Sequence, residues 1–366
     1  MKIRELLTLI DDERPRSSSS TGSDLVRGFA SGDSTMRRYV LGRNELSRQV
    51  CASCEIDGVI DDYTNESYYV GVPVLRMREL PNDAVVVNCS LSISPVSAQK
   101  KLEQSAIRGC FYYCELSAID GQAYPLPASS LGFRKELREH VENYEKLYGI
   151  MADEASKKTM LDIFRLRLSA DPCCMHDYGV RVDEQYFEEF LKLEEGGSFA
   201  DVGGFDGDTT EELLLRYPGY SKVHFFEPSL QNLNKAKHRL GSCEVISYYH
   251  TGVSNSAGEA LLSGEGGPTC VFSDVGEERV EVNTLDNLLA DPIDFIKMDI
   301  EGFELKALEG ASRHIADPRT KLAIAAYHKP EDIRCICDFV LALRPHAKVY
   351  LRHYTEGVSE SILFFV

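Results

Sequence analysis

The sequence predicts an α/β protein with two sheets of mainly parallel strands. Short apolar segments alternate with longer segments whose apolar residues have helical spacing, the pattern of strands followed by helices. This alternation occurs in two separate stretches, residues 37–116 and 196–366. A chain of 366 residues is also longer than one ordinary domain, so we expect each stretch to form a domain of its own.

The composition excludes several classes of partner. Lys and Arg number 40 against 58 Asp and Glu, so the formal net charge is −18. A chain this acidic, without a basic stripe, is not expected to bind nucleic acid or an anionic membrane surface. No apolar run reaches the roughly 20 residues that a membrane helix needs, and residues 1–16 lack the apolar core of a signal peptide. The sequence therefore predicts a cytoplasmic protein with no nucleic-acid partner and no membrane insertion.

The 11 cysteines show no spacing typical of a disulfide framework. Cys51 and Cys54 form a C-x-x-C pair, but they lie in a segment with helical spacing, and no His pair completes a zinc site. We expect reduced thiols packed as small apolar groups, with a zinc site as the alternative.

Two further segments accompany the predicted α/β domains. Residues 1–36 contain SSSSTGS and GFASGDS, a composition that builds no core, and are expected to form a flexible N-terminal arm. Residues 117–195 carry long runs with helical spacing, punctuated by prolines, and are expected to form a helical connector between the two domains.

The domain at 37–116 resembles the small Rossmann-like module found in sugar-modifying enzymes and ahead of some methyltransferase domains. The resemblance rests on the strand pattern and on the segments GVIDD (58–62) and GVPV (71–74). The turn after its first strand contains Gly42 alone, where a dinucleotide fingerprint has further glycines. We therefore expect a docking module, or a dimerisation module of a homo-oligomer, rather than a nucleotide site.

The domain at 196–366 contains seven apolar strand segments. The last two are joined by a short Thr-Glu-Gly-Val-Ser turn and should form an antiparallel hairpin at the sheet edge. A mostly parallel sheet that ends in such a hairpin resembles the Rossmann-like class I S-adenosylmethionine-dependent methyltransferase fold. Short strands between residues 250 and 294 are expected to form a hairpin flap near the pocket or an extension of the sheet edge. The seven segments are 198–202, 223–229, 243–250, 294–300, 321–328, 348–354 and 360–366.

The charges after the first of these strands distinguish a methyltransferase from a dehydrogenase. A pyrophosphate at a helix N-terminus should meet bare backbone donors. In this chain Asp206 and Asp208 lie in the loop, and Glu211 and Glu212 follow in the first helical turn. These carboxylates would repel a pyrophosphate, whereas S-adenosylmethionine carries a sulfonium and an amino group, both positive. The sequence therefore favours S-adenosylmethionine as the ligand.

The expected roles of the loop residues follow from their positions. Asp201 closes the first strand and is expected to meet the methionine end of the cofactor, directly or through water, while Gly203 and Gly207 let the loop approach the ligand. Glu227 ends the second strand and is expected to accept hydrogen bonds from the ribose. Helix capping by Asp208 or Thr209 is the alternative. The predicted cofactor-binding residues are Asp201, Gly203, Gly204, Phe205, Gly207, Asp208, Thr209, Glu227 and Pro228.

Several motifs give this region a closer resemblance, to the FkbM family of methyltransferases, over residues 183–366. Phe205 replaces the middle glycine of the general methyltransferase loop, which fits this family. The resemblance implies methyl transfer from S-adenosylmethionine to a hydroxyl of a sugar, a polyketide or another small-molecule or glycan acceptor. The alternative is a catalytically inactive protein of the same fold that binds a partner through its N-terminal domain. The motifs are DVGGFDGDTT (201–210), FFEP (225–228), VNTLDNLL (282–289), DFIKMDIEGFELKALEGA (294–311), AAYHKPEDI (325–333) and YLRHY (350–354).

Three polar residues follow neighbouring strands and are the predicted catalytic residues. Asp299 and Glu301 follow the fourth strand and His328 follows the fifth, so all three should meet at the carboxyl edge of the sheet. His328 has the ordinary pKa of a general base, and Asp299 is expected to orient it or to bind the acceptor. We expect no metal, although a divalent ion held by these three residues is the alternative.

Overall fold

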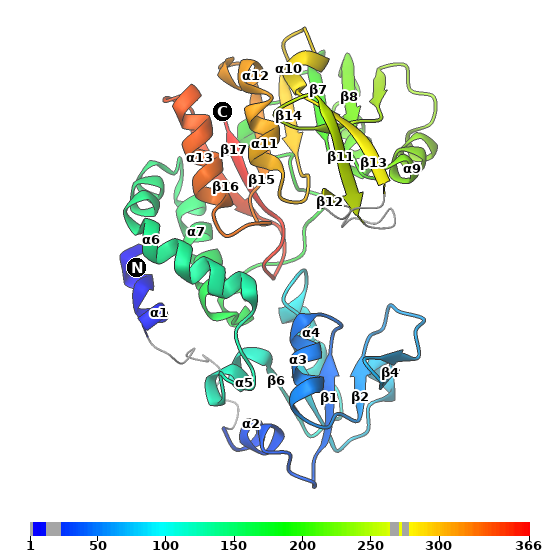
Figure 1. Ribbon diagram of the computed structural model, residues 1–366, viewed down its shortest axis with the longest axis vertical. Helices are drawn as coiled ribbons and strands as arrows, with labels where there is room; N and C mark the ends of the chain where they lie inside the picture. The colour runs from blue at the N-terminus through cyan, green and yellow to red at the C-terminus, as the bar shows by residue number, and fades with distance from the viewer. Residues whose placement is uncertain (1–2, 12–22, 264–270, 273–277) are drawn as a thin grey trace. The chain divides into compact units, whose positions relative to one another are not determined.

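The chain folds into two compact units in the computed structural model, which Figure 1 shows as a ribbon. The structure describes residues 3–11, 23–263, 271–272 and 278–366. The segment expected as one helical connector is divided between the units, because residues from Arg181 onward belong to the second. The first unit contains Met1–Tyr148, Lys158–Val180 and His353–Ser359, and the second contains Gly149–Lys157, Arg181–Arg352 and Glu360–Val366.

The first unit is built on a six-stranded sheet with the order β3-β4-β2-β1-β5-β6, parallel except for the β3–β4 pair. Strand β5 lies inside the sheet and is buried along its whole length, as expected for its apolar run. The strands are β1 (Arg37–Leu41), β2 (Gly58–Ile60), β3 (Tyr68–Tyr69), β4 (Val72–Leu75), β5 (Ala84–Asn88) and β6 (Gly109–Tyr112). The main helices are α3 (Glu45–Ser53), α4 (Pro95–Glu103), α5 (Tyr113–Ile119), α6 (Ala128–Ile150) and α7 (Glu154–Ser169).

The prediction of a flexible N-terminal arm is wrong for the segment that forms helix α2 (Ser23–Ala30). Val26 and Phe29 stand three positions apart, so they share one helix face, and both are buried in the core of the first unit. The ring of Phe29 packs edge-on against that of Phe111 at a centroid distance of 5.3 Å. Two apolar side chains on one face are enough to hold this short helix on the sheet, although its flanks are rich in Ser and Gly.

The second unit contains a seven-stranded sheet with the order β16-β17-β15-β14-β7-β8-β9. The five strands from β15 to β9 are parallel, and β17 runs antiparallel to β15. The predicted class I methyltransferase fold with its C-terminal antiparallel strands is therefore confirmed. The strands are β7 (Ser198–Val202), β8 (Lys222–Phe226), β9 (Ile246–Tyr249), β14 (Phe295–Met298), β15 (Lys321–Ala325), β16 (Val349–His353) and β17 (Ser361–Phe365). The helices are α8 (Asp208–Arg216), α9 (Leu230–Leu240), α10 (Leu285–Leu288), α11 (Glu304–Glu309), α12 (Ser312–Ala316) and α13 (Asp332–Leu343).

The strands between β9 and β14 form a separate small sheet, so an extension of the main sheet edge is the wrong alternative. Its order is β10-β13-β11-β12, with β11 and β13 paired as antiparallel neighbours and β10 parallel to β13. Residues 264–270 and 273–277 of this insertion lie outside the described residues. The strands are β10 (Gly252–Val253), β11 (Gly258–Ser263), β12 (Val271–Phe272) and β13 (Glu278–Asn283).

The strand order of the second unit changes direction between β7 and β14, which is where open α/β sheets bind their ligands. The two strands approach closely just beyond their carboxyl ends. A Cβ atom on Gly203 would lie 2.0 Å from the carbonyl oxygen of Asp299, and Gly203 has φ +81°. Only glycine satisfies both conditions.

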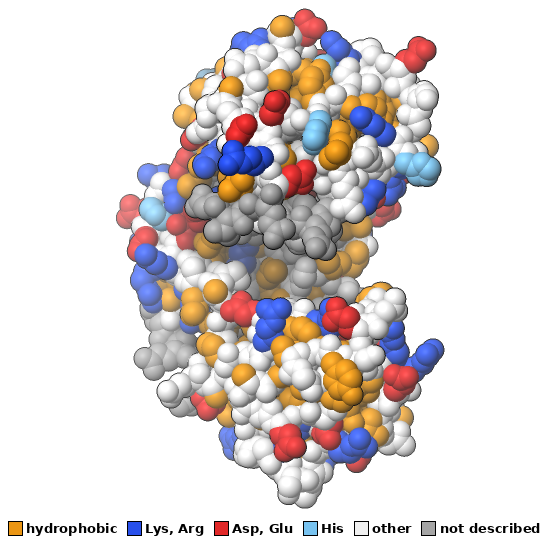
Figure 2. Space-filling view, turned by 45° about the vertical axis from the view of Figure 1, so that its right-hand side comes forward, with side chains coloured by type: hydrophobic (Ala, Val, Ile, Leu, Met, Phe, Trp, Pro, Cys, Tyr) orange, Lys and Arg blue, Asp and Glu red, His pale blue; other side chains and the backbone are white. Residues whose placement is uncertain are grey.

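The surface carries charges of both signs. Figure 2 shows Asp and Glu side chains interspersed with Lys and Arg over the face in view. The described cysteines carry free thiols. Within the described part of the chain, no helix combines the length and the apolar composition that crossing a membrane requires.

Replacing Gly203 by Ala should destabilise the protein, because the new methyl group meets backbone that has no room to move. We expect a loss of roughly 1–3 kcal/mol in the free energy of unfolding, measured by urea denaturation. Gly258→Ala is the matched control, since no atom lies within 4 Å of its added Cβ. Equal effects of the two substitutions would contradict the close approach of the two strand ends.

Candidate active site

A cavity of about 570 Å³ lies at the carboxyl ends of β7, β8 and β14 and is lined entirely by residues of the second unit. Residues after each of these strands contribute to it, together with Thr251–Val253 and Leu262 from the insertion. A further wall comes from residues 182–187, which precede β7 in the chain. The insertion thus borders the cavity, as the flap interpretation requires.

Asp201 does not line this cavity, so direct contact with the cofactor, one of the two arrangements expected for it, does not fit the structure. Its carboxylate is fully buried and forms an ion pair with the Nζ of Lys297 at 3.1 Å. The Thr210 hydroxyl donates to its other oxygen at 2.7 Å. Burial opposes the charge of Lys297, but the carboxylates of Asp201 and Asp299 outweigh it and raise the pKa of the Lys297 ammonium. Sequence reasoning missed Lys297 because a lysine inside an apolar strand has no distinctive spacing.

Gly204 and Gly207 also serve packing rather than ligand contact. A Cβ on Gly204 would lie 2.3 Å from the ring of Phe225, and one on Gly207, which has φ +88°, would lie 2.9 Å from Leu240. Neither glycine lines the cavity, whereas Gly203, Phe205, Asp208 and Thr209 do. These two glycines therefore allow the loop to pack closely against β8 and α9.

Glu227 lines the cavity beside Pro228 at the end of β8, where the sequence places a ribose-binding acid. One carboxylate oxygen accepts the N–H of Phe205 at 3.0 Å and the other accepts the N–H of Ser229 at 2.8 Å. Burial raises the pKa of Glu227 to about 7, and the two backbone donors only partly oppose this shift. The side chain joins the glycine loop to β8 and keeps lone pairs that face no backbone donor.

The acids near the start of α8 are largely paired. Arg239 of α9 lies 2.6 Å from Asp206 and 3.1 Å from Glu211, and Arg216 lies 2.6 Å from Glu212. Helix α8 begins at Asp208, with Gly207 at the capping position and without a side-chain cap. The carboxylate of Asp208 accepts the N–H of Thr209 at 2.6 Å in the first turn of the helix, so the alternative role of Asp208 at the helix end stands beside the proposed ligand contact.

Asp299 is held by two tyrosines that sequence reasoning missed. The hydroxyl of Tyr186 donates to one oxygen of Asp299 at 2.7 Å, and that of Tyr327 lies 3.3 Å from the same oxygen. Tyr186 is buried and has φ +75°, an unusual conformation for a bulky residue. Tyr327 also reaches Glu360 at 3.3 Å. Tyr186 lies 113 residues from Asp299 in the sequence, so no local pattern indicates this contact.

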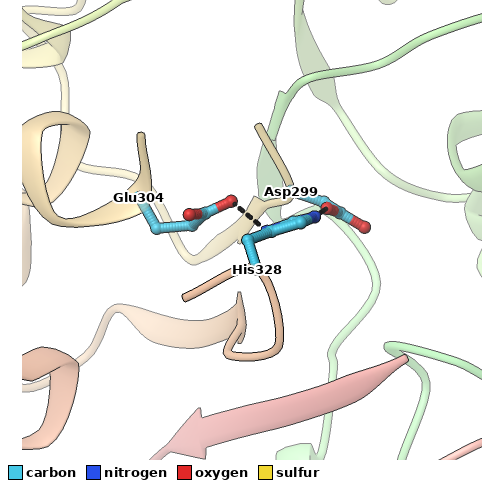
Figure 3. A group of neighbouring side chains, drawn as sticks. All are labelled: Asp299, Glu304 and His328. Atoms are coloured by element: carbon cyan, nitrogen blue, oxygen red, sulfur yellow. Dashed lines mark ion pairs between the residues drawn. The ribbon is translucent and has the colours of Figure 1, made fainter. Parts of the chain in front are cut away.

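His328 lies between two carboxylates, as Figure 3 shows. Its Nδ1 is 3.0 Å from Glu304, and its Nε2 is 3.6 Å from both Asp299 and Glu301. Burial lowers the pKa of the imidazole, but the hydrogen bond to Glu304 and the charges of the three acids outweigh it and raise the pKa to about 9. The side chain is therefore protonated at neutral pH, and the prediction that it is the general base is not supported by this geometry.

Glu301 occupies a strained turn that points its carboxylate into the cavity. Glu301 has φ +55° and the following Gly302 has φ +89°. One oxygen of Glu304 accepts the N–H of Ile300 at 2.9 Å and that of Gly302 at 3.3 Å, which stabilises the turn. Burial raises the pKa of Glu301 to about 7, although the charge of His328 opposes this shift. Of the three predicted catalytic residues, Glu301 is the one poised to exchange a proton near neutral pH.

The same residues fit an imidazolium better than a metal centre. Among the described residues, Asp299, Glu304 and His328 bring one ligand atom each within 4.8 Å of one another. However, the two ring nitrogens of His328 face different carboxylates, so the imidazole separates the acids instead of sharing a central ion with them. A doubly protonated ring carries a positive charge that attracts carboxylates on both sides, and carboxylates lie on both sides of His328 here.

Comparisons with known proteins indicate the family of the second unit. Residues 201–352 match the sequence model of the methyltransferase FkbM domain. Methyltransferase FkbM from Methylobacillus flagellatus KT superposes with a TM-score of 0.76 and 21% sequence identity, over 100% of this chain and 98% of that chain. A putative O-methyltransferase from Klebsiella pneumoniae gives a TM-score of 0.33 and 13% identity, over 62% and 96% of the respective chains. No curated protein matches the chain.

The fold and the cavity thus define the second unit as a class I methyltransferase, and S-adenosylmethionine is the methyl donor of this class. More particularly, the chain contains an FkbM methyltransferase domain at residues 201–352. The resemblance drawn from the sequence motifs is confirmed.

The protonated state of His328 is open to direct measurement. A pH titration of its ring resonances by NMR should give a pKa near 9. Glu304→Gln should lower that pKa towards the ordinary value of about 6.5, because it removes the nearest negative charge. Glu309→Gln, on the exposed side of the same helix, should leave the pKa unchanged. A wild-type pKa at or below 6.5 would restore His328 as a base.

Proposed function

We propose that the protein transfers a methyl group from S-adenosylmethionine to a hydroxyl of a sugar, a polyketide or another small-molecule or glycan acceptor. The FkbM domain supports the reaction class. The observation that supports a hydroxyl acceptor is the carboxylate of Glu301, which lines the cavity with a pKa raised to about 7 by burial. A hydroxyl loses a proton when it is methylated, and a base that titrates near neutral pH suits that task.

The residues at the ends of β7 and β8 fit the donor. Each oxygen of Glu227 accepts one backbone N–H and has a further lone pair for a ribose hydroxyl. Phe205, Asp208 and Thr209 line the same part of the cavity at the start of α8. Bound S-adenosylmethionine supplies an electrophilic methyl carbon on a positively charged sulfur.

The residues at the ends of β14 and β15 take the acceptor roles. The carboxylate of Glu301 accepts the hydroxyl proton, and Asp299, held by Tyr186 and Tyr327, accepts a hydrogen bond that orients the acceptor. The imidazolium of His328 keeps these two acids in place, since its Nε2 lies 3.6 Å from each. Proton removal of this kind contributes about 10²–10⁴-fold to a rate, and positioning contributes the rest.

The charge of the cavity supports a small acceptor without phosphate groups. Lys297 is the lysine that lines it, and its ammonium is already paired with Asp201. Glu212, Asp299, Glu301 and other acids make up much of the remaining polar wall. A polyphosphate or nucleic-acid acceptor would meet repulsion here and no free cation among the described lining residues.

We propose a docking or dimerisation role for the small α/β module of the first unit. A dinucleotide would need the N-terminus of helix α3, which follows β1. The side chain of Asn44 accepts the N–H of Ser47 there at 3.1 Å and donates to the carbonyl of Cys89 at 2.7 Å. This cap takes up the position that a pyrophosphate would use, which supports a protein partner over a nucleotide.

The acceptor role of Glu301 is tested by transfer of a tritiated methyl group to a panel of sugar and polyketide hydroxyls. For any acceptor found, Glu301→Gln should lower kcat by roughly 10²–10⁴-fold, because the amide cannot take the proton. Affinity for S-adenosylhomocysteine, which is neutral at sulfur, should stay the same. Glu309→Gln should retain the wild-type rate. Full activity of Glu301→Gln would remove Glu301 as the proton acceptor.

Glu227→Gln should change the binding of the methyl donor rather than the transfer step. It should weaken the binding of S-adenosylmethionine and S-adenosylhomocysteine equally, by about an order of magnitude, because both contain the ribose that Glu227 is proposed to hold. Contacts that persist into the transition state affect KM more than kcat, so the rate at saturating donor should change little. Calorimetric dissociation constants equal to those of the wild type would contradict the ribose contact.

A further inference from the structure

The acids around His328 outnumber the positive charges that face them. Asp299, Glu301, Glu304 and Glu360 interact with the imidazolium of His328, and Lys297 is a second positive charge that interacts with Asp299. All four carboxylates are partly or fully buried. Three of the four have hydrogen-bond donors of their own. Asp299 accepts from Tyr186 and Tyr327, Glu304 accepts from two backbone N–H groups, and Glu360 accepts from Gln185 at 2.8 Å.

Glu301 is the exception in this group. Among the described residues its carboxylate accepts no hydrogen bond, and its contact is with Nε2 of His328 at 3.6 Å. It also lines the cavity, with 30% of its side chain exposed against 18% for Asp299 and 1% for Glu304. Few contacts stabilise the ionised form of this carboxylate, so its protonation state responds to the charge of a ligand in the cavity.

We propose that Glu301 is the charge-compensating residue of the cavity: it is ionised when the bound ligand carries a positive charge beside it, and it takes up a proton when the ligand is neutral there. This inference rests on the proposed binding of S-adenosylmethionine in this cavity. The charged and titratable groups that face Glu301 are His328, Asp299, Glu304, Glu360, Tyr327, Tyr186 and Lys297.

The physical cause is the energy of holding another negative charge in a partly buried group of acids. Burial and the neighbouring carboxylates raise the pKa of Glu301 to about 7 in the absence of a ligand. A sulfonium beside the carboxylate favours its ionised form and lowers this pKa. Binding of the sulfonium donor below pH 7 must therefore release a proton, and its affinity rises as the pH rises through 7.

The thioether product has no charge at sulfur, so its binding leaves the pKa of Glu301 unchanged. The ratio of the two dissociation constants therefore depends on pH, and the cavity prefers the donor over its by-product more strongly above pH 7 than below it. Glu227 also has a pKa of about 7. Because it faces the ribose proposed to be common to both ligands, its titration cancels in the ratio.

The test measures binding and needs no acceptor. Dissociation constants of the full-length protein for S-adenosylmethionine and S-adenosylhomocysteine are measured by calorimetry at pH 6 and pH 8. Repeating the measurement in buffers of different ionisation enthalpy gives the number of protons released. The preference for S-adenosylmethionine should increase with pH in the wild type, by up to about tenfold between pH 6 and pH 8, because the pKa of Glu301 in the absence of a ligand is about 7.

Two variants separate this effect from titration of the ligands themselves. Glu301→Gln should show no increase beyond that of the free ligands, and at pH 6 it should release no more protons with S-adenosylmethionine than with S-adenosylhomocysteine, while Glu309→Gln should behave like the wild type. The difference in proton release between the two ligands in the wild type tests the proposal even if Glu301→Gln fails to fold, because any proton released from Glu227 is common to both ligands. The same pH dependence in Glu301→Gln, or equal proton release with the two ligands in the wild type, would overturn the inference while leaving the methyltransferase proposal intact. No binding of S-adenosylmethionine at millimolar concentration would overturn both.

Discussion

The buried ion pair between Lys297 and Asp201 is the interaction on which the second unit depends. It joins β14 to β7 at the centre of the sheet, and Thr210 of α8 completes it with a hydrogen bond to Asp201. The ammonium of Lys297 also donates to the carbonyl of Gly203 and lies 5.5 Å from the centre of the Tyr186 ring. A buried pair of this kind is stable only when its remaining polar atoms find partners. Here those partners are the glycine loop and the wall of the cavity, so the loop after β7 and the wall that contains Tyr186 are held in one arrangement.

The acids of the site differ in role because they differ in surroundings. Glu227 and Glu301 are both brought to a pKa of about 7 by burial, but Glu227 accepts two backbone N–H groups and Glu301 accepts none from the described residues. Glu304 is the most buried of the group and serves His328 and the turn before α11. The same side-chain chemistry thus provides one acid that holds a loop, one that supports a turn, and one that remains free to change its charge.

The family match and the cavity do not have the same limits. The FkbM domain spans residues 201–352, whereas Gln185, Tyr186 and Glu360 lie outside it and still line the cavity. Gln185 donates to Glu360, and Tyr186 donates to Asp299, so residues before and after the matched region meet around the proposed acceptor end. The proposed donor end is built from residues inside the matched region, among them Phe205 and Glu227.

The sequence by itself determined the strand pattern of the second unit, the C-terminal antiparallel strands, and the meeting of Asp299, Glu301 and His328 at one sheet edge. These follow from local apolar periodicity and from the rule that parallel strands bring their carboxyl ends together. Only the tertiary structure decided which of these residues carries which charge. The pKa of His328 depends on its burial and on Glu304, the partner of Asp201 is a lysine 96 residues away in the chain, and helix α2 is held by a core formed elsewhere. Burial and partners that are distant in the sequence determine the pKa of each site residue, and a local sequence pattern contains neither.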